Sequence, residues 1–177
     1  MYYLLIIILI ILICIGIIYN LLVKQKNKVD QAESNIDVYL NQRFDLIPNL
    51  LECVKEYSKY ESEVLEKITT LRSDYMNNKN NLQTKSNLNK DFNNILGTIE
   101  NYPELKASEQ FLNLQRNLSK MESQLQAARR IYNNEATLYN TKIAVFPLNI
   151  VAGLFGFKRK LLFEIEQGKE ENINVDI

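Results

Sequence analysis

The sequence predicts an all-α protein in which an N-terminal transmembrane helix is followed by an elongated antiparallel bundle of three to four long helices. Three observations support this prediction. The 177 residues include only 5 Gly and 3 Pro, so the chain has few turns and long elements are favoured. The first 23 residues carry no charge. Beyond them, apolar residues recur at steps of three and four, which is the period of a helix.

Residues 1–23 are the predicted transmembrane anchor. Fifteen of these positions are Ile or Leu, and a helix of this length extends about 34 Å, enough to cross a bilayer core of about 30 Å. A cleaved secretory signal is the alternative, but the segment lacks a basic start and a small-residue cleavage site. Lys24, Lys26 and Lys28 follow at once. By the positive-inside rule we expect a single-pass protein of the cell membrane, with its N-terminus outside and its body in the cytoplasm.

Residues 24–147 are predicted to form the helical bundle, beginning with a long helix up to about residue 76. Pro48 lies inside the helical pattern of this stretch, where it removes a backbone hydrogen bond and clashes with the carbonyl four residues earlier. We therefore expect a kink or a helix restart near Asp45, after which the helix continues. Arg43 and Asp45 are candidates to satisfy the carbonyls that the kink frees.

Two polar or proline-containing stretches predict the remaining helix ends. The run NNKNN at 77–81 lacks apolar positions and predicts the first connection. The second helix follows and stops before Tyr102-Pro103, because a residue that precedes Pro avoids helical angles. The third helix is predicted from Glu104 to about residue 143, where the chain approaches Phe146-Pro147.

The C-terminal part differs in character from the bundle. Residues 148–163 read LNIVAGLFGFKRKLLF and combine apolar side chains with a basic cluster. This segment is predicted either to lie in the membrane interface or to close the bundle as a fourth helix, and both alternatives stay open. In the first case the membrane contacts are Phe155, Phe157, Lys158, Arg159 and Lys160. Residues 164–177 are predicted to be a disordered acidic tail.

The composition argues against catalytic, metal-binding and nucleic-acid-binding sites. The chain has no His, 2 Cys, and 21 basic against 21 acidic residues. Imidazole-dependent catalysis and ordinary zinc sites are therefore excluded, and no net field attracts nucleic acid. No Gly-rich phosphate loop and no metal-ligand spacing is present. We expect no catalytic, cofactor-binding or metal-binding residues and no enzymatic activity.

Four charged residues occupy positions where the helical pattern expects apolar ones: Glu61, Arg72, Glu122 and Arg129. In an antiparallel pair of helices, residues in contact have a nearly constant sum of their numbers. Residues 61 and 129 add to 190, and 72 and 122 add to 194, which agrees within about one helical turn. We predict the pairs Glu61–Arg129 and Arg72–Glu122, which fix the register because an unpaired buried charge is costly.

A second interpretation makes some of these residues part of a ligand site. Glu61 and Arg129 would line a polar pocket for a small ligand, together with Tyr132, Asn133, Tyr139 and Asn140. The two Tyr-Asn pairs are seven residues apart, so they lie on one side of a helix. Core packing of both Tyr rings with anchored hydroxyl groups is the simpler explanation.

Several blocks of sequence resemble the LemA family of bacterial membrane proteins. They are RFDLIPNL at 43–50, KEYSKYE at 55–61, IENYPELKASEQFLNLQ at 99–115, ESQLQAARRIYNNEATLYN at 122–140 and FP at 146–147. The uncharged segment that ends in YNLLV at 19–23 is similar as well. The resemblance implies a single-pass membrane protein with an antiparallel helical bundle. It implies no enzymatic activity, cofactor or substrate, and no catalytic residues.

Two functional hypotheses remain. The first is a non-enzymatic scaffold or adaptor that presents a helical rod to partner proteins at the cytoplasmic face of the membrane, since a rod offers lateral surface and little concavity. The second is a membrane-shaping or envelope-maintenance protein that acts through lipid contacts of residues 148–163. The expected partners are the lipid bilayer and other membrane-associated proteins, with a homo-oligomer as a further possibility and no nucleic acid.

Overall fold

The fold was taken from a computed structural model that describes residues 2–57, 62–78, 82–99 and 101–163. Every regular element within these ranges is a helix, which confirms the predicted all-α class. The chain forms two compact units. Unit 1 comprises Met1–Glu33 and Ala128–Ile177, and unit 2 comprises Ser34–Ala127.

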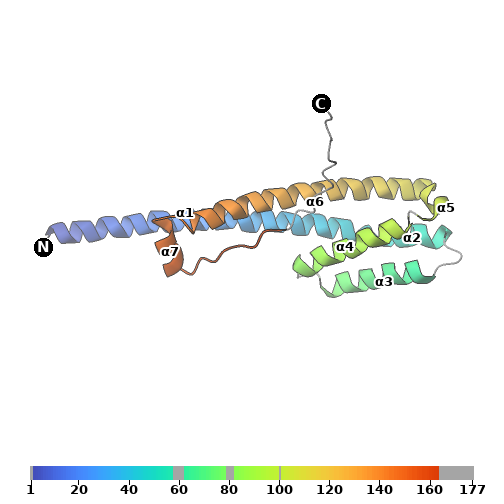
Figure 1. The fold of residues 1–177 in the computed structure, drawn as a ribbon, viewed down its shortest axis with the longest axis horizontal. Coiled ribbons are helices and arrows are strands. Elements are labelled where there is room, and N and C mark those ends of the chain that lie inside the picture. Colours follow the sequence, from blue (N-terminus) through green and yellow to red (C-terminus); the bar gives the residue numbers. More distant parts are fainter. Residues whose placement is uncertain (1, 58–61, 79–81, 100, 164–177) are drawn as a thin grey trace, which may run out of the picture. The chain divides into compact units, whose positions relative to one another are not determined.

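Seven helices make up the described parts of the chain (Figure 1). They are α1 (Tyr2–Phe44), α2 (Ile47–Tyr57), α3 (Ser62–Asn77), α4 (Leu82–Ile99), α5 (Pro103–Lys106), α6 (Glu109–Lys142) and α7 (Leu148–Leu154).

Each proline of the chain marks a helix start. Pro48 is the second residue of α2, Pro103 is the first residue of α5, and Pro147 directly precedes α7. Backbone N–H groups in the first turn of a helix have no acceptor within the helix, so proline, which lacks an N–H, loses no hydrogen bond there. The fixed φ of proline also suits the first turn. The restart predicted near Asp45 is confirmed, because α1 ends at Phe44 and a two-residue turn precedes α2.

The N-terminal part of α1 contains a segment long and apolar enough to cross a membrane, with a mean hydropathy of 3.2 over its best 18 residues. Its side chains are mostly exposed, as Leu4 (63%), Leu12 (60%) and Ile17 (57%) illustrate. Exposed aliphatic side chains at this density are costly in water and favourable in lipid. The predicted anchor is thus present as a helix with a lipid-compatible surface.

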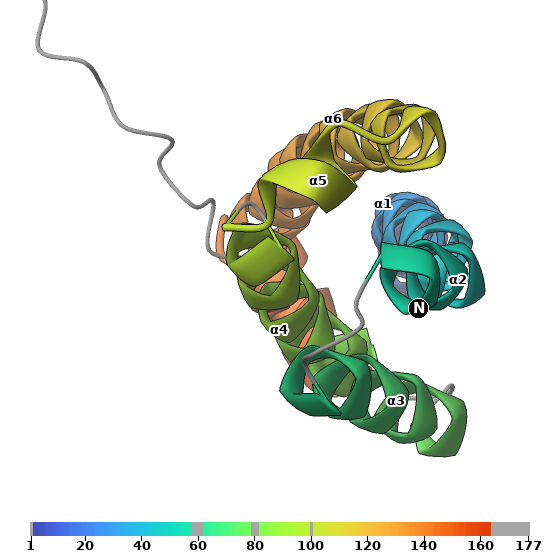
Figure 2. The ribbon, with the colours of Figure 1, turned by 90° about the vertical axis from the view of Figure 1, so that its right-hand side faces the viewer.

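Unit 2 is built from helices that reverse direction at short connections. The connection predicted at 77–81 is confirmed, since α3 ends at Asn77 and α4 begins at Leu82. Helices α3 and α4 lie side by side, and α3 also packs against α2 (Figure 2). Three aromatic rings join α1, α3 and α4, because Phe44 stacks on Tyr75 with ring centroids 4.4 Å apart and lies 6.2 Å from Phe92.

Unit 1 contains α1 up to Glu33, α6 from Ala128 onward, and α7. Val151 and Ala152 of α7 pack on Leu22 of α1. Gly156 then ends α7 with a φ of 70°, a left-handed conformation that glycine adopts without strain. The amides of Phe157 and Gly156 donate to the carbonyls of Ala152 and Gly153, which is the Schellman pattern. This cap directs the chain into residues 157–163, called the strap below.

Candidate functional site

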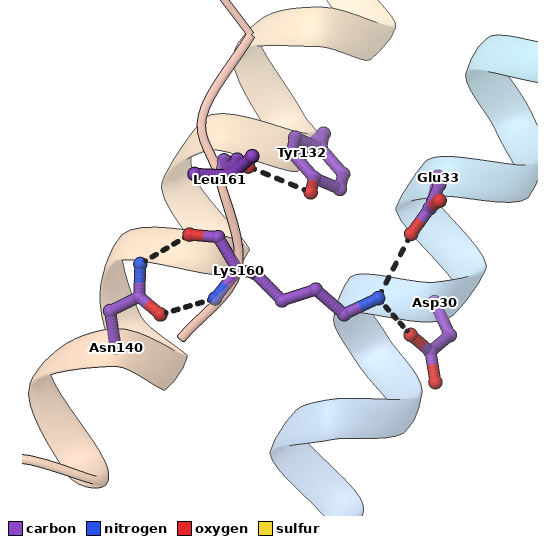
Figure 3. Close-up of polar contacts among 6 residues, drawn as sticks. All are labelled: Asp30, Glu33, Tyr132, Asn140, Lys160 and Leu161. Carbon is purple, nitrogen blue, oxygen red and sulfur yellow. Dashed lines mark hydrogen bonds and ion pairs between the residues drawn. The ribbon is translucent and has the colours of Figure 1, made fainter. Parts of the chain in front are cut away.

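The strap is held by side chains of α6 that bind its backbone (Figure 3). Asn140 accepts from the amide of Lys160 at 2.9 Å and donates to the carbonyl of the same residue at 2.8 Å. Asn133 makes the same pair of bonds to Phe163, at 2.8 Å each. The Tyr132 hydroxyl donates to the carbonyl of Leu161 at 2.9 Å. These five bonds satisfy strap backbone groups that have no secondary structure to satisfy them.

The spacing of the two asparagines matches the path of the strap. Asn133 and Asn140 are seven residues apart on α6, which is about 10.5 Å along the helix axis. Lys160 and Phe163 are three residues apart, and an extended chain covers about 10 Å over that distance. The Tyr-Asn repeat in the sequence is therefore the signal of this interaction. The structure places the chain's own strap on it instead of the small-ligand pocket that sequence analysis considered.

The side chain of Lys160 crosses from the strap to α1 (Figure 3). Its Nζ lies 2.8 Å from Oδ1 of Asp30 and 3.0 Å from Oε2 of Glu33. Partial burial lowers the pKa of Lys160, but the hydrogen bonds to both carboxylates and their charges outweigh this effect and raise the pKa above its ordinary value. The ammonium group therefore stays charged at neutral pH. Asp30 and Glu33 are residues that sequence analysis missed.

The rings of this site have a structural role. Burial raises the pKa of Tyr132 and of Tyr139, so both hydroxyls stay protonated at neutral pH. The ring of Phe163 meets that of Tyr132 edge-on at 5.0 Å. A charged lysine, neutral phenols and amides engaged with backbone suit recognition of a chain segment and offer no activated nucleophile. We call Asp30, Glu33, Tyr132, Asn133 and Asn140 the clamp.

The predicted membrane contacts divide into two groups. Lys160 pairs with Asp30 and Glu33 of the clamp, and its predicted contact with lipid headgroups stays a prediction. Phe157 packs against the cluster around Leu22. Phe155, Lys158 and Arg159 are exposed, and Phe155 also contacts the ring of Tyr19 at 4.8 Å.

Unit 2 has its own polar contacts, centred on Arg43 of α1. This side chain is 3% exposed and forms an ion pair with Glu122 of α6. It also donates to Oδ1 of Asn93, and its guanidinium lies 5.3 Å from the centre of the Phe92 ring. Arg43 thus links α1, α4 and α6. Its predicted role in satisfying carbonyls at the helix break stays a prediction, and the side chain of Asp45 is exposed there.

The predicted pair Arg72–Glu122 is wrong. Glu122 pairs with Arg43, and Arg72 is exposed on α3. The prediction assumed that one helix from 29 to 76 follows the third helix throughout. Instead, α3 packs against α4 and α2. Arg72 therefore does not follow the predicted register of the first helix against the third. Glu61 lies outside the described residues, and its pairing with the buried Arg129 stays a prediction.

Residue pairs in both units give the actual register of α1 against α6. In unit 1, Nε2 of Gln25 donates to Oε2 of Glu135 at 2.7 Å, and these residue numbers add to 160. In unit 2, Arg43 and Glu122 add to 165. Both sums are about 30 below the predicted ones. The helices are antiparallel as expected, but the partner of each residue is shifted.

A second buried cation in unit 2 was missed. Lys85 of α4 is 2% exposed, and its Nζ contacts Oδ1 of Asp37 at 2.5 Å and Oδ1 of Asn41 at 2.9 Å. The Tyr75 hydroxyl donates to the same oxygen of Asn41 at 2.9 Å. Burial raises the pKa of Tyr75, so the phenol remains a donor. The sequence offers one signal for this contact, a lysine three residues before Leu88 on the apolar side of the second helix.

An open groove of about 520 Å³ runs along the outer side of α3 and α4. Its apolar residues are Leu71, Leu88 and Ile95. Four acidic residues and one basic residue line it as well: Glu63, Glu66, Asp74, Asp91 and Lys67. Lys67 is paired with Glu63 at 2.7 Å, which lowers the pKa of that carboxyl. The groove therefore combines an apolar surface with an excess of negative charge.

The fold and the site define a class: helical proteins with one N-terminal helix able to span a membrane. Among the described residues no group of acidic or cysteine side chains is arranged to hold a metal ion. The family model of the LemA family matches residues 32–177. The chain therefore belongs to the LemA family.

Two kinds of curated relatives are similar to the chain. Protein LemA of Metamycoplasma hominis is 29% identical over 176 residues, covering 93% of this chain and 80% of the relative. The magnetosome proteins MamQ 1 and MamQ 2 of Paramagnetospirillum magneticum are each 22% identical over 175 residues. Their alignments cover 82% of this chain but only 64% of the relatives' own length.

Proposed function

We propose that this LemA-family protein is a non-enzymatic, membrane-anchored scaffold that docks a partner protein on its helical body. The observation that carries the proposal is the groove along α3 and α4. Its lining combines Leu71, Leu88 and Ile95, which are 4–8% exposed, with four acidic side chains. A second pocket of unit 2, of about 380 Å³, is lined by Arg43 and Glu122, which already pair with each other. An apolar groove with charged edges is a common receptor for a helix.

The chemistry of the groove specifies the partner. Residues 63 and 74 are 11 positions apart on α3, or about 16 Å, which corresponds to three turns of a bound helix. Glu66, Asp74 and Asp91 are exposed along it. Opposite charges steer association and fix the register of the complex. The proposed occupant is therefore an amphipathic helix of another protein with Lys or Arg on both sides of its apolar face.

A photo-cross-linking residue placed in the groove tests this function. We expect Thr70, which lines the groove, to yield an adduct in cells whose peptide maps to a basic amphipathic helix. The matched control is the neighbouring Thr69, which is exposed but does not line the groove. The double variant Glu66→Lys, Asp91→Lys should remove the adduct, and Glu104→Lys should not. Equal adducts from Thr69 and Thr70 would contradict the docking site.

The orientation of the body is part of the same proposal. Lys24, Lys26 and Lys28 directly follow the apolar part of α1, and a cluster of this kind favours the cytoplasmic side. Protease added to intact cells should leave the body undigested and should degrade it after lysis. Digestion in intact cells would place the body outside.

A second candidate function, action on the membrane itself, is favoured by one observation. Side chains around α7 are apolar and exposed although α7 packs on Leu22, at the end of the apolar segment of α1. They are Phe146 (79%), Ile150 (54%), Leu154 (71%) and Phe155 (55%). At an interface these residues bury apolar area, and Lys158 and Arg159 add attraction to anionic lipid.

Single tryptophans test this lipid contact, because the chain contains no Trp. In vesicles with brominated lipids, we expect strong quenching of Phe155→Trp fluorescence. Ile131→Trp is the control, since Ile131 is equally exposed (55%) but lies 12 residues before Ile143 of the α7 contact cluster, about 18 Å along the helix. Equal quenching of both variants, or of neither, would contradict an interfacial α7.

A further inference from the structure

The clamp contacts two side chains of the strap and otherwise binds the backbone of the strap. Five of its bonds go to peptide groups, which every sequence except proline provides. The sequence-dependent contacts are Lys160 with Asp30 and Glu33, and the Phe163 ring with Tyr132. Leu161, between them, is 87% exposed and adds little contact. The clamp is thus specific for a short extended segment with Lys followed three residues later by an aromatic ring.

We infer that the clamp is a peptide-recognition site which, besides the chain's own strap, takes the strap of a second copy of this protein. Lysine followed three residues later by an aromatic residue occurs once in the sequence, at Lys160 and Phe163. Within the chain, the strap is therefore the segment that matches the clamp. An exchanged strap makes the same contacts in trans as in cis, so exchange changes few interactions.

The position of the site favours exchange between copies in one membrane. The clamp residues Asp30 and Glu33 follow the end of the anchor segment by about two to three turns of α1, so clamps and straps of neighbouring copies lie at one height above the bilayer. Binding of the strap to the clamp of its own chain, called cis closure below, competes with exchange. The short connection gives the strap an effective concentration on the order of millimolar at that clamp. A decisive experiment must therefore remove cis closure without removing the trans site.

Two complementary full-length variants meet this requirement. Lys160→Ser with Phe163→Ser keeps the clamp and disables the strap. Asn133→Ala with Asn140→Ala keeps the strap and removes four of the bonds of the clamp. Neither variant closes well in cis, and a mixture contains one intact clamp and one intact strap on different chains.

Co-purification of differently tagged copies from detergent measures the exchange. We expect the complementary mixture to be recovered as a pair about tenfold more than a mixture of two strap-disabled chains, since the ion pairs of Lys160 and the ring contact of Phe163 distinguish them. Lys158→Ser with Leu161→Ser, which alters exposed strap residues, should pair as the unchanged strap does. Equal recovery of the complementary and strap-disabled mixtures would overturn exchange between copies.

A peptide probe tests recognition separately from pairing. The fluorescent peptide FKRKLLF, residues 157–163, should bind the strap-disabled chain in micelles and should bind the wild type at least tenfold more weakly, because the cis strap occupies the clamp. Replacing the lysine that corresponds to Lys160 by Glu should abolish binding. Equal binding to the strap-disabled and clamp-disabled chains would mean adsorption to micelles and would overturn the recognition site. The groove of unit 2 plays no part in either assay, so failure here leaves the scaffold proposal standing.

Discussion

Lys85 and Arg43 of unit 2 are held in a different way from Lys160 of unit 1. In unit 2, Lys85 and Arg43 are 2% and 3% exposed and connect helices through buried polar contacts. In unit 1, Lys160 is 28% exposed and its carboxylate partners are 46% and 39% exposed. Losing the acidic partner in the first kind of contact leaves a buried cation, whereas in the second kind water can replace each partner.

The polar contacts of the two units therefore serve different ends. Those of unit 2 fix one arrangement of helices, because another arrangement would leave Lys85 or Arg43 buried without a partner. Those of unit 1 hold a segment that has no regular structure and is bound chiefly by hydrogen bonds to its backbone. The strap is therefore detachable at modest cost, which is what a recognition site requires.

The largest effect is expected for Arg43→Met. This change leaves Glu122, which is 24% exposed, without its buried partner and should lower the free energy of unfolding by about 3–5 kcal/mol. Unfolding of the full chain in detergent, followed by circular dichroism, measures it. Arg116→Met on the exposed side of α6 is the control. Adding Glu122→Met should recover most of the loss, and a variant as stable as the control would contradict the buried pair.

Lys85→Met should cost less, about 1–3 kcal/mol of unfolding free energy. Asp37 is 39% exposed and can regain water, so the main loss is the bridge through Asn41 to Tyr75. The same unfolding measurement applies, with the exposed Lys90→Met in α4 as its control. A loss equal to that of Arg43→Met would mean that exposure of the partner does not decide the cost.

Asn140→Ala should affect the strap alone. It removes two hydrogen bonds to Lys160, each worth about 0.5–1.5 kcal/mol, and leaves the contacts of unit 2 in place. We expect faster hydrogen exchange of the strap peptide containing the Lys160 amide, with exchange in α4 unchanged. The control is Asn134→Ala, an exposed asparagine on the same helix. Equal acceleration in α4 would show that the strap and unit 2 open together.

The smallest effect is expected from alkaline pH. The folded-state pKa of Lys160 is raised above its ordinary 10.5, so its contribution is fully present below that pH and is lost as pH rises beyond it. Tyr132, whose pKa is raised from 10.0, also loses its donated bond only above that range. Fluorescence of a Phe163→Trp variant should therefore stay constant up to about pH 10 and then report release. Release near neutral pH would contradict the assignment.

Local sequence rules predicted much of the helical framework. Pro48 indicated the restart after Phe44, and the NNKNN run indicated the connection between α3 and α4. The apolar start of the chain indicated the helix that can span a membrane. These features depend on residues close together in the chain, where helix period, proline and polar runs act directly.

Features that depend on distant residues were harder to predict. The pair Arg72–Glu122 failed because α3 packs against α4, and no local pattern reports where a helix packs. Lys160 was assigned to lipid because its neighbours are apolar and basic, although two carboxylates on α1 bind it. The repeated Tyr-Asn pairs at 132 and 139 were noticed, but their partner lies in a strap that has no periodicity to reveal it.

We expect the strap to open by itself, without unfolding of unit 2. Hydrogen exchange of the full chain at increasing urea tests it most directly, because local opening exposes little surface and responds weakly to denaturant. We predict that the amides of Lys160 and Phe163 exchange at a rate nearly independent of urea, while that of Phe92 in α4 accelerates steeply. The same steep dependence at all three amides would show one cooperative structure and would contradict a detachable strap.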